Sequence, residues 1–380
     1  MLVLERLDRG GHDLERAAWY AVRGDPGCPA ERYVLSTPQT RAICNRPELL
    51  GVAYTEALCQ AMATGLASAP FAERITQHRE DSVCVLHLLR GGLNFGLRRA
   101  VGQAFGYNRH GSAFMSSQRF EQDGRWGVAD DSYRKLDIPQ DAILVLGDVV
   151  ATGVTLENGL EVVRKHMLAI GASAKAMVFF TIGGPRAEQA LGRIHERFVE
   201  TFPGYERTCV VYIEGRFTLA DEHTPLRTKE LGTDLLRLDA LLAPEFELSQ
   251  YESLPHALER CSIYDAGSRA FAIHTYATDV IDYWQQILEL SKAGLSLREL
   301  LLERWPDLAP APRAEVLSRA SERWVGVDAT LLQQLLMARQ AFWSELVGPF
   351  GSRSAPLTAL CERRIQVMRD AAGLSNGDHA

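Results

Sequence analysis

Four short, continuously apolar runs stand out along the first part of the chain, at residues 84–89, 142–146, 176–182 and 209–213. Apolar and polar positions do not alternate within them. Such runs are typical of strands in a parallel sheet that helices cover on both faces. The pattern therefore predicts four buried strands.

Between the second and third runs, apolar residues recur every three or four positions from Leu156 to Ile170. This spacing places them on one face of a helix, and Gly171 is of the type that ends one. A second helix is predicted over roughly residues 48–75. Strand, helix and strand in this order indicate a βαβ unit, and thus an α/β fold with a parallel sheet flanked by helices.

The pattern changes near Tyr276, where strand-like runs give way to amphipathic helical stretches separated by prolines. The chain is therefore predicted to consist of an α/β domain, residues 1–275, and an all-helical C-terminal extension, residues 276–380. The helices of the extension are expected at 277–292, 296–304, 314–324, 330–347 and 357–371.

Composition narrows the class of protein. The 380 residues are 46% hydrophobic and 23% charged, the profile of a globular chain rather than a disordered one. No apolar run reaches the length of about 18 residues that suggests a membrane helix. The formal net charge of −7 lacks the basic footprint of a nucleic-acid binder. We therefore expect small-molecule partners, and neither nucleic acid nor a membrane.

The seven cysteines argue against a zinc cluster or a disulfide framework, because their number is odd and no Cys-x-x-Cys occurs. Acidic and basic residues follow the N-terminus too soon for a signal peptide. Both features predict a protein of the reducing cytoplasm.

The informative segment is residues 143–155, Ile-Leu-Val-Leu-Gly-Asp-Val-Val-Ala-Thr-Gly-Val-Thr. A buried strand runs into Asp148, then into a turn of small residues, then into a helix. Backbone amides at such a turn point outward and favour an anion, and Thr152 and Thr155 add hydroxyl donors. Asp148 suits sugar hydroxyls or Mg²⁺ instead. Together these parts predict a sugar-phosphate site; the alternative is a plain strand-to-helix turn.

Other phosphate-binding loops fit less well. No Lys follows the last glycine, as the Walker pattern requires, and no Gly-x-Gly-x-x-Gly follows a strand. A Walker-type nucleoside triphosphate site and a dinucleotide-binding fold therefore have little support.

Residues 143–155 resemble the motif of type I phosphoribosyltransferases that binds 5-phosphoribosyl 1-diphosphate (PRPP). That motif has four apolar residues, two acids, two apolar residues, a small residue and Thr-Gly-Gly-Thr. This chain departs from it at Gly147, in place of the first acid, and at Val154, in place of the middle glycine. The uracil phosphoribosyltransferase branch also has a single acid, although at the first place. The resemblance implies the type I phosphoribosyltransferase fold.

Two segments before this motif resemble the same branch. Arg90, Gly91 and Gly92 follow the first apolar run, as in the family's Arg-Ala-Gly-Leu diphosphate loop. Arg119 and the later Tyr-Arg-Lys-Leu at 133–136 resemble its mobile loop. Arg119 is also explained by a charged, solvated loop.

A third segment, residues 265–271, resembles the family's Asp-Ala-Gly-Asp-Arg-x-Phe and begins at Asp265. It lies farther from the PRPP motif than in the family, and a turn before a helix explains it equally well. Cys-Ser-Ile-Tyr stands at 261–264 where uracil enzymes have the Pro-Gly-Leu-Gly that reads uracil.

The resemblance implies a role for each matched residue. Asp148, Arg119 and Asp265 would be catalytic, and Asp148 and Asp265 would hold Mg²⁺, mostly through PRPP. The PRPP-binding set would be Arg90, Gly91, Gly92, Arg119, Asp148, Val149, Val150, Ala151, Thr152, Gly153, Val154 and Thr155.

The expected function is transfer of 5-phosphoribosyl from PRPP to an acceptor, with release of diphosphate. The altered uracil-reading stretch argues against plain uracil, and the acidic chain makes a specialised acceptor such as an aminoglycoside, or a modified base, a candidate. The alternative is a non-catalytic protein that senses PRPP or a nucleotide. Homodimerisation is expected from the resemblance alone.

Overall fold

We describe the protein from a computed structural model. It describes residues 2–7, 13–24, 27–89, 93, 96–116, 119–122, 125–128, 133–150, 153–229, 234–259, 272–348 and 353–374, with only the backbone at 119–122, 125–128 and 346.

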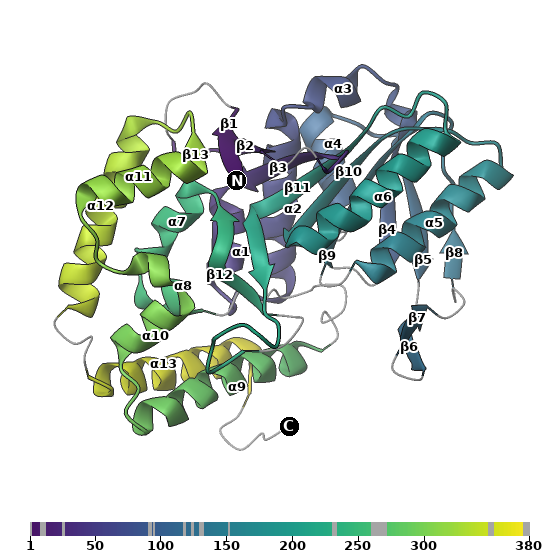
Figure 1. The fold of residues 1–380 in the computed structure, drawn as a ribbon. Helices are drawn as coiled ribbons and strands as arrows, with labels where there is room; N and C mark the ends of the chain where they lie inside the picture. Colours follow the sequence, from purple (N-terminus) through teal and green to yellow (C-terminus); the bar gives the residue numbers. More distant parts are fainter. Residues whose placement is uncertain are drawn as a thin grey trace.

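A single mixed sheet forms the centre of the molecule (Figure 1). Its strands follow the order β13-β1-β2-β3-β11-β10-β9-β4-β5-β8, and β12 pairs with β11 beside this path. The six strands from β3 to β5 in this order are mutually parallel. The strand bounds are β1 Val3–Arg6, β2 Ala18–Arg23, β3 Glu31–Ser36, β4 Val83–Leu89, β5 Gly111–Ser116, β8 Tyr133–Lys135, β9 Ala142–Val150, β10 Ala174–Gly183, β11 Arg207–Leu219, β12 Leu235–Leu242 and β13 Trp324–Val325.

Helices cover both faces of the parallel part (Figure 1). On one face lie α1 (Pro38–Asn45), α2 (Gly51–Ser68) and α4 (Leu97–Phe105), with α2 packed against both of the others. On the other face α5 (Val154–Ala169) packs against α6 (Pro185–Thr201). Because both faces are covered, the central strands are apolar along nearly their whole length, as β9 shows from Ala142 to Leu146.

The predicted α/β fold with a mostly parallel sheet and a helical C-terminal region is confirmed. The four apolar runs are β4, β9, β10 and β11, and the periodic segment after β9 is α5. The helix predicted over 48–75 is instead divided into α2 and the short α3 (Ala72–Thr76). Pro70 explains the break, because proline has no amide to donate and disfavours helix at the residue before it.

The N-terminal strands were not predicted from the sequence. β1 and β2 extend the sheet in antiparallel fashion from β3, and all three strands contain charged residues that the apolar-run criterion rejects. Arg32 of β3 is 7% exposed and lies 3.7 Å from a carboxylate oxygen of Glu188. A buried arginine with an acidic neighbour therefore takes a position where an apolar residue is usual.

The C-terminal region contains α9 (Ile273–Lys292), α10 (Leu297–Arg304), α11 (Arg313–Arg323), α12 (Ala329–Ala341), a π-helical turn (Phe342–Val347) and α13 (Ala355–Ala372). Helices α9 and α13 pack along each other, and α12 packs against α7 (Pro244–Gln250). The region also supplies β13, which pairs in parallel with β1 at the sheet edge.

The division of the chain into two domains at residue 275 stays a prediction. None of the described helices is long and apolar enough to cross a membrane.

A buried ion-pair network joins α13 to the rest of the chain. Arg364 donates from Nε to Glu259 at 3.2 Å and from Nη2 to Glu48, before α2, at 2.9 Å. Trp284 of α9 donates its indole N–H to the other oxygen of Glu259 at 2.8 Å. Glu259 is fully buried, and burial raises its pKa to about 7. The guanidinium therefore compensates a carboxylate that water cannot reach.

Replacing Arg364 with Met should destabilise the protein by about 3–5 kcal/mol, because it leaves Glu259 buried without its cation. The measurement is denaturant unfolding at neutral pH. Arg363→Met is the matched control: Arg363 is exposed on the same helix, and its loss should cost no more than about 0.5 kcal/mol. Equal losses in the two variants would contradict the role given to the network.

Candidate functional site at the carboxyl edge of the sheet

The direction of the chain connections reverses between β4 and β9. The connection from β4 runs through α4 to β5, on one side of this pair. The connection from β9 runs through α5 to β10, on the other side and over the other face. Ligands of open α/β sheets bind at such a reversal, in the crevice outside the carboxyl ends of the strands.

The two strands also part toward their carboxyl ends. Register pairs between β4 and β9 join residues 83–85 to residues 143–145. By contrast, β9 stays paired with β10 along its whole length, up to Val150 and Gly183. Register pairing between β4 and β9 therefore ends before the carboxyl ends of the two strands.

Gly147, on β9, lies against Leu93, which follows β4 in the sequence. A Cβ atom at Gly147 would be 3.0 Å from Leu93 Cβ, 3.2 Å from Leu93 O and 3.2 Å from Phe180 O. Two of these three atoms are backbone atoms and cannot turn aside. A side chain at position 147 would therefore collide with Leu93, which is itself buried.

Asp148 follows on the end of β9 and is half-buried. Its Oδ1 accepts the backbone N–H of Val149 at 2.8 Å. Its register partner on β10 is Thr181, a polar residue inside an otherwise apolar strand. Thr181 is fully buried, and its hydroxyl has no hydrogen-bond partner within the described part of the chain. Sequence reasoning missed Thr181; its one signal was a hydroxyl within the third apolar run.

Helix α5 begins directly after this edge, with Gly153 as its N-cap at φ +80°. A Cβ there would come within 3.1 Å of Ala190 Cβ and 3.3 Å of Arg186 O, both on α6. Glycine is thus required both by the left-handed backbone and by the close approach of α6. The first intrahelical hydrogen bond is Glu157 N–H to Gly153 O, so the amides of residues 154–156 precede it and point toward the edge.

Charge near the start of α5 is largely balanced. Glu157 lies in the first turn, where a free carboxylate would repel an anion. Hydrogen bonds and ion pairs from Arg193 and Arg197 of α6 hold its pKa below its ordinary value. Two arginines therefore offset one acid beside the helix start.

The structure brings six of the predicted site residues to this edge: Asp148, Val149, Val150, Gly153, Val154 and Thr155. Arg119 starts β6 (Arg119–Gln122), which pairs with β7 (Arg125–Val128) in a hairpin. This hairpin leaves the sheet after β5 and extends beyond it (Figure 1). The remaining predicted residues lie outside the described part of the chain; they are Arg90, Gly91, Gly92, Ala151, Thr152 and Asp265.

His87 on β4 stacks on Phe114 of β5, with ring centroids 4.5 Å apart and ring planes 7° apart. Burial lowers the pKa of His87 to about 4, with a smaller contribution from Arg98. The imidazole is therefore neutral at physiological pH and acts as a packing group rather than as a cation for phosphate.

A second buried carboxylate, Glu214, lies farther along the same edge, on β11 beside α1. It accepts hydrogen bonds from the Thr40 hydroxyl and, at 3.3 Å, from the Thr37 amide. Its backbone has φ of 62°, which is unusual for a residue with a side chain. Burial raises its pKa to about 7, opposed by Arg41. Its other oxygen has no hydrogen-bond partner within the described residues.

No protein-family model matches this sequence, and a search of curated proteins finds no significant match. Solved structures align with less than half of the chain. A purine phosphoribosyltransferase from Pyrococcus horikoshii aligns at 16% identity and a TM-score of 0.24, over 43% of this chain and 93% of its own. A hypoxanthine-guanine phosphoribosyltransferase from Bacillus anthracis aligns at 16% identity and a TM-score of 0.25, over 47% of this chain and 90% of its own. An adenine phosphoribosyltransferase from Thermoanaerobacter pseudethanolicus aligns at 12% identity and a TM-score of 0.25, over 43% of this chain and 85% of its own. Likeness at this level identifies neither family nor function.

Gly147→Ala should destabilise the protein by about 1–3 kcal/mol, because the new methyl group meets the backbone of Leu93 and Phe180. Gly111→Ala on β5 is the control, since a Cβ there would lie no closer than 3.8 Å to its neighbours. Thermal or denaturant unfolding measures both. A Gly147→Ala protein as stable as the control would mean that Leu93 does not restrict this position.

Stability should fall as the pH rises from about 5 to about 8, in part because of Glu214. Its pKa is about 7 when folded and ordinary when unfolded, so over this range the folded state binds the extra proton. Glu214→Gln removes this titration. Its free energy of unfolding should therefore fall less between pH 5 and pH 8 than that of the wild type, by on the order of 1–3 kcal/mol. Unfolding at pH 5 and pH 8 tests it; identical slopes in both proteins would refute the assignment.

Proposed function

We propose that the chain binds PRPP at the carboxyl edge between β4 and β9 and transfers its phosphoribosyl group to an acceptor. The observation that carries the proposal is the placement of Asp148 and the start of α5 together at a reversal of chain direction. This is where the general rule for α/β sheets puts a ligand, and the two features suit the two ends of a sugar phosphate.

The 5′-phosphate would lie at the start of α5, against the amides of Gly153, Val154 and Thr155, with Thr152 completing the loop. Backbone amides and the positive end of the helix dipole favour an anion there. Asp148 would accept hydrogen bonds from the ribose hydroxyls. Since Leu93 fills the space at Gly147, this single carboxylate would hold the ribose.

The diphosphate would be bound from the opposite side of the crevice, by Arg90, Gly91 and Gly92 after β4. Arg119, at the start of the β6–β7 hairpin, would supply a second guanidinium group. Guanidinium groups suit this task because they offer several donors to phosphate oxygens and stay charged at every physiological pH.

In the transfer step, a nucleophilic N–H or O–H of the acceptor would attack C1 of the ribose. The C1–O bond would break, diphosphate would leave with the electron pair, and the acceptor would lose its proton. Positive charge develops on the ribose and negative charge on the leaving group, so bound arginines and exclusion of water would lower the barrier.

Magnesium would bind mainly to diphosphate oxygens, with Asp148 and Asp265 as its protein ligands. The described residues contain no cluster of three or more potential metal ligands. This fits a cation that keeps several waters and is carried in with a phosphate substrate, since such a site needs only one or two carboxylates. The cation would neutralise charge on the leaving diphosphate.

The acceptor would differ from plain uracil, because residues 261–264 replace the stretch that reads uracil in the family the motif resembles. An amine or hydroxyl of a specialised metabolite such as an aminoglycoside, or a modified base, is the proposed class. We also propose a cytoplasmic homodimer, on the resemblance alone.

A second candidate is a non-catalytic sensor of PRPP or a nucleotide. It is favoured by Gly147, where contact with Leu93 leaves no room for the acid of the family's motif. Turnover separates the two: an enzyme releases diphosphate when an acceptor is added, whereas a sensor binds without release.

Asp148→Asn should weaken binding of Mg²⁺-PRPP at least about tenfold, because an amide is a poorer acceptor for ribose hydroxyls than a carboxylate. Calorimetric titration of the full chain measures it. Asp141→Asn is the control: Asp141 lies at the opposite end of β9, with φ of 51°, a conformation that Asn tolerates. Binding unchanged in Asp148→Asn, or lost equally in Asp141→Asn, would refute the assignment.

A further inference from the structure

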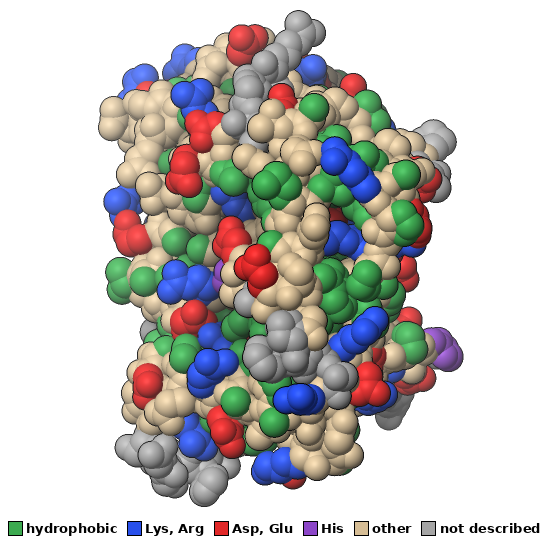
Figure 2. All heavy atoms as spheres, turned by 90° about the vertical axis from the view of Figure 1, so that its left-hand side faces the viewer, with side chains coloured by type: hydrophobic (Ala, Val, Ile, Leu, Met, Phe, Trp, Pro, Cys, Tyr) green, Lys and Arg blue, Asp and Glu red, His purple; other side chains and the backbone are tan. Residues whose placement is uncertain are grey.

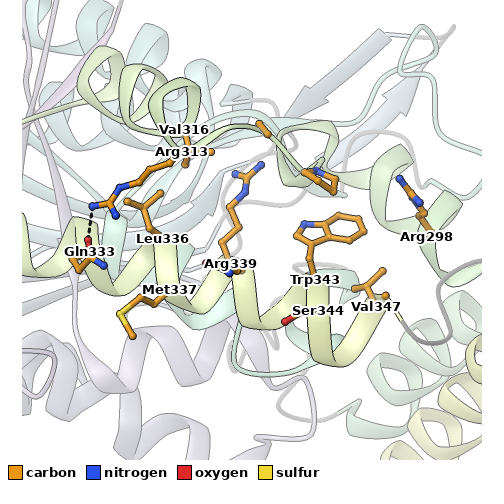
Figure 3. Close-up of a pocket in the computed structure, with 14 residues that line it drawn as sticks. Arg298, Arg313, Val316, Gln333, Leu336, Met337, Arg339, Trp343, Ser344 and Val347 are labelled. Atoms are coloured by element: carbon orange, nitrogen blue, oxygen red, sulfur yellow. Dashed lines mark hydrogen bonds between the residues drawn. The ribbon is translucent and has the colours of Figure 1, made fainter.

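A cavity of about 570 Å³ opens in the C-terminal helical region, away from the sheet edge. It lies among α10, α11, α12 and the π-helical turn at 342–347 (Figure 3). Figure 2 views the side of the molecule on which α11 and α12 lie, where hydrophobic side chains are exposed among charged side chains of both signs. The volume falls within the range of about 300–1,000 Å³ that is usual for small-ligand sites.

Much of the wall is apolar. Val316, Leu336, Met337, Trp343 and Val347 contribute to it. Met337 is 62% exposed, which is high for a large apolar residue. An exposed apolar side chain at the border of a cavity favours a ligand with an apolar body.

The wall is held rigid by hydrogen bonds to the backbone. The indole N–H of Trp343 donates to the carbonyl of Leu308. Arg339 donates to the carbonyl of Asp307 at 2.6 Å and to that of Ala309. The π-helical turn is closed by the bond from Gly348 N–H to Trp343 O, at 2.7 Å. The cavity is therefore formed before any ligand arrives, which lowers the entropic cost of binding.

Two further arginines border the cavity and pair with no carboxylate of the described residues. The guanidinium of Arg298 lies 5.8 Å from the centre of the Trp343 ring. Arg313 donates to the amide oxygen of Gln333 at 2.8 Å (Figure 3). In contrast, the nearby Arg319 and Arg323 both pair with Asp307.

This charge arrangement is unusual for the chain. Its formal net charge is −7, yet the described residues that line the cavity include three arginines and no Asp or Glu. Arg339 is committed to backbone carbonyls, whereas Arg298 and Arg313 remain available to an anion. An apolar wall bordered by two such cations favours a ligand that has a flat, apolar body and a negative charge.

We propose that this cavity is a binding site for a small aromatic anion, with the ring against Trp343 and the acidic group at Arg298 beside it. Arg313 borders the other end of the cavity (Figure 3) and adds to its positive charge. The site is separate from the carboxyl edge of the sheet and does not depend on the transferase proposal. A second copy of this chain is the alternative occupant.

Calorimetric titration with 2-naphthoate tests the proposal on the full chain. We expect saturable binding by the wild type, and at least about tenfold weaker binding of the neutral 2-naphthamide, which lacks the charge-assisted contacts. The double variant Arg298→Gln/Arg313→Gln should lose at least about tenfold in affinity for 2-naphthoate. Met337→Glu should weaken it as well, by adding a negative charge at the border.

Arg363→Gln is the matched control, because it removes one positive charge from an exposed position of α13 outside the cavity, and it should bind as the wild type does. Circular dichroism confirms that each variant is folded. No binding of 2-naphthoate by the wild type up to millimolar concentration would overturn the proposal, as would equal binding of 2-naphthamide or unchanged binding by the double variant. Light scattering that shows a dimer abolished by Met337→Glu would assign this face to a second copy and would also overturn it.

Discussion

The arrangement of this protein depends on one constraint: β9 must be covered by helices on both faces, and yet its carboxyl end must stay partly accessible at Asp148. Its first residues, from Ala142 to Leu146, are completely buried between α5 on one side and the helices around α4 on the other. Beyond them the coverings separate, because the connections from β4 and β9 run in opposite directions. The polar end of the strand, at Asp148, is consequently half-buried: it keeps its pairing with β10, whereas the register pairs with β4 end at Val145.

The sequence was most informative where burial is complete. Continuous apolar runs located β4, β9, β10 and β11, and spacing located α5, because helix-covered strands and amphipathic helices leave clear periodic signals. Strands β1, β2 and β3 were not predicted, because each of them contains charged residues that interrupt the apolar pattern. Arg32 is buried beside Glu188, a residue far along the chain. A compensating partner so distant cannot be recognised from local pattern.

The candidate site was predictable as a loop but not as a surface. The residues 143–155 indicated a carboxylate followed by a small-residue turn and a helix, and the structure places Asp148 and Gly153 accordingly. It could not be foreseen that Leu93 fills the space beside Gly147, because the two residues are far apart in the sequence and meet only in the folded chain. The same holds for Thr181, which becomes a neighbour of Asp148 only through strand register.

The pairing of β1 with β13 has a consequence for how the chain matures. Residues 3–6 are made more than 300 residues before their partners at 324–325. Until then the outer edge of the sheet offers unpaired amides and carbonyls, the usual template for unwanted strand addition between molecules. Synthesis must pass residue 325 before this edge closes, so a prematurely terminated chain would be prone to aggregate even with its central strands complete.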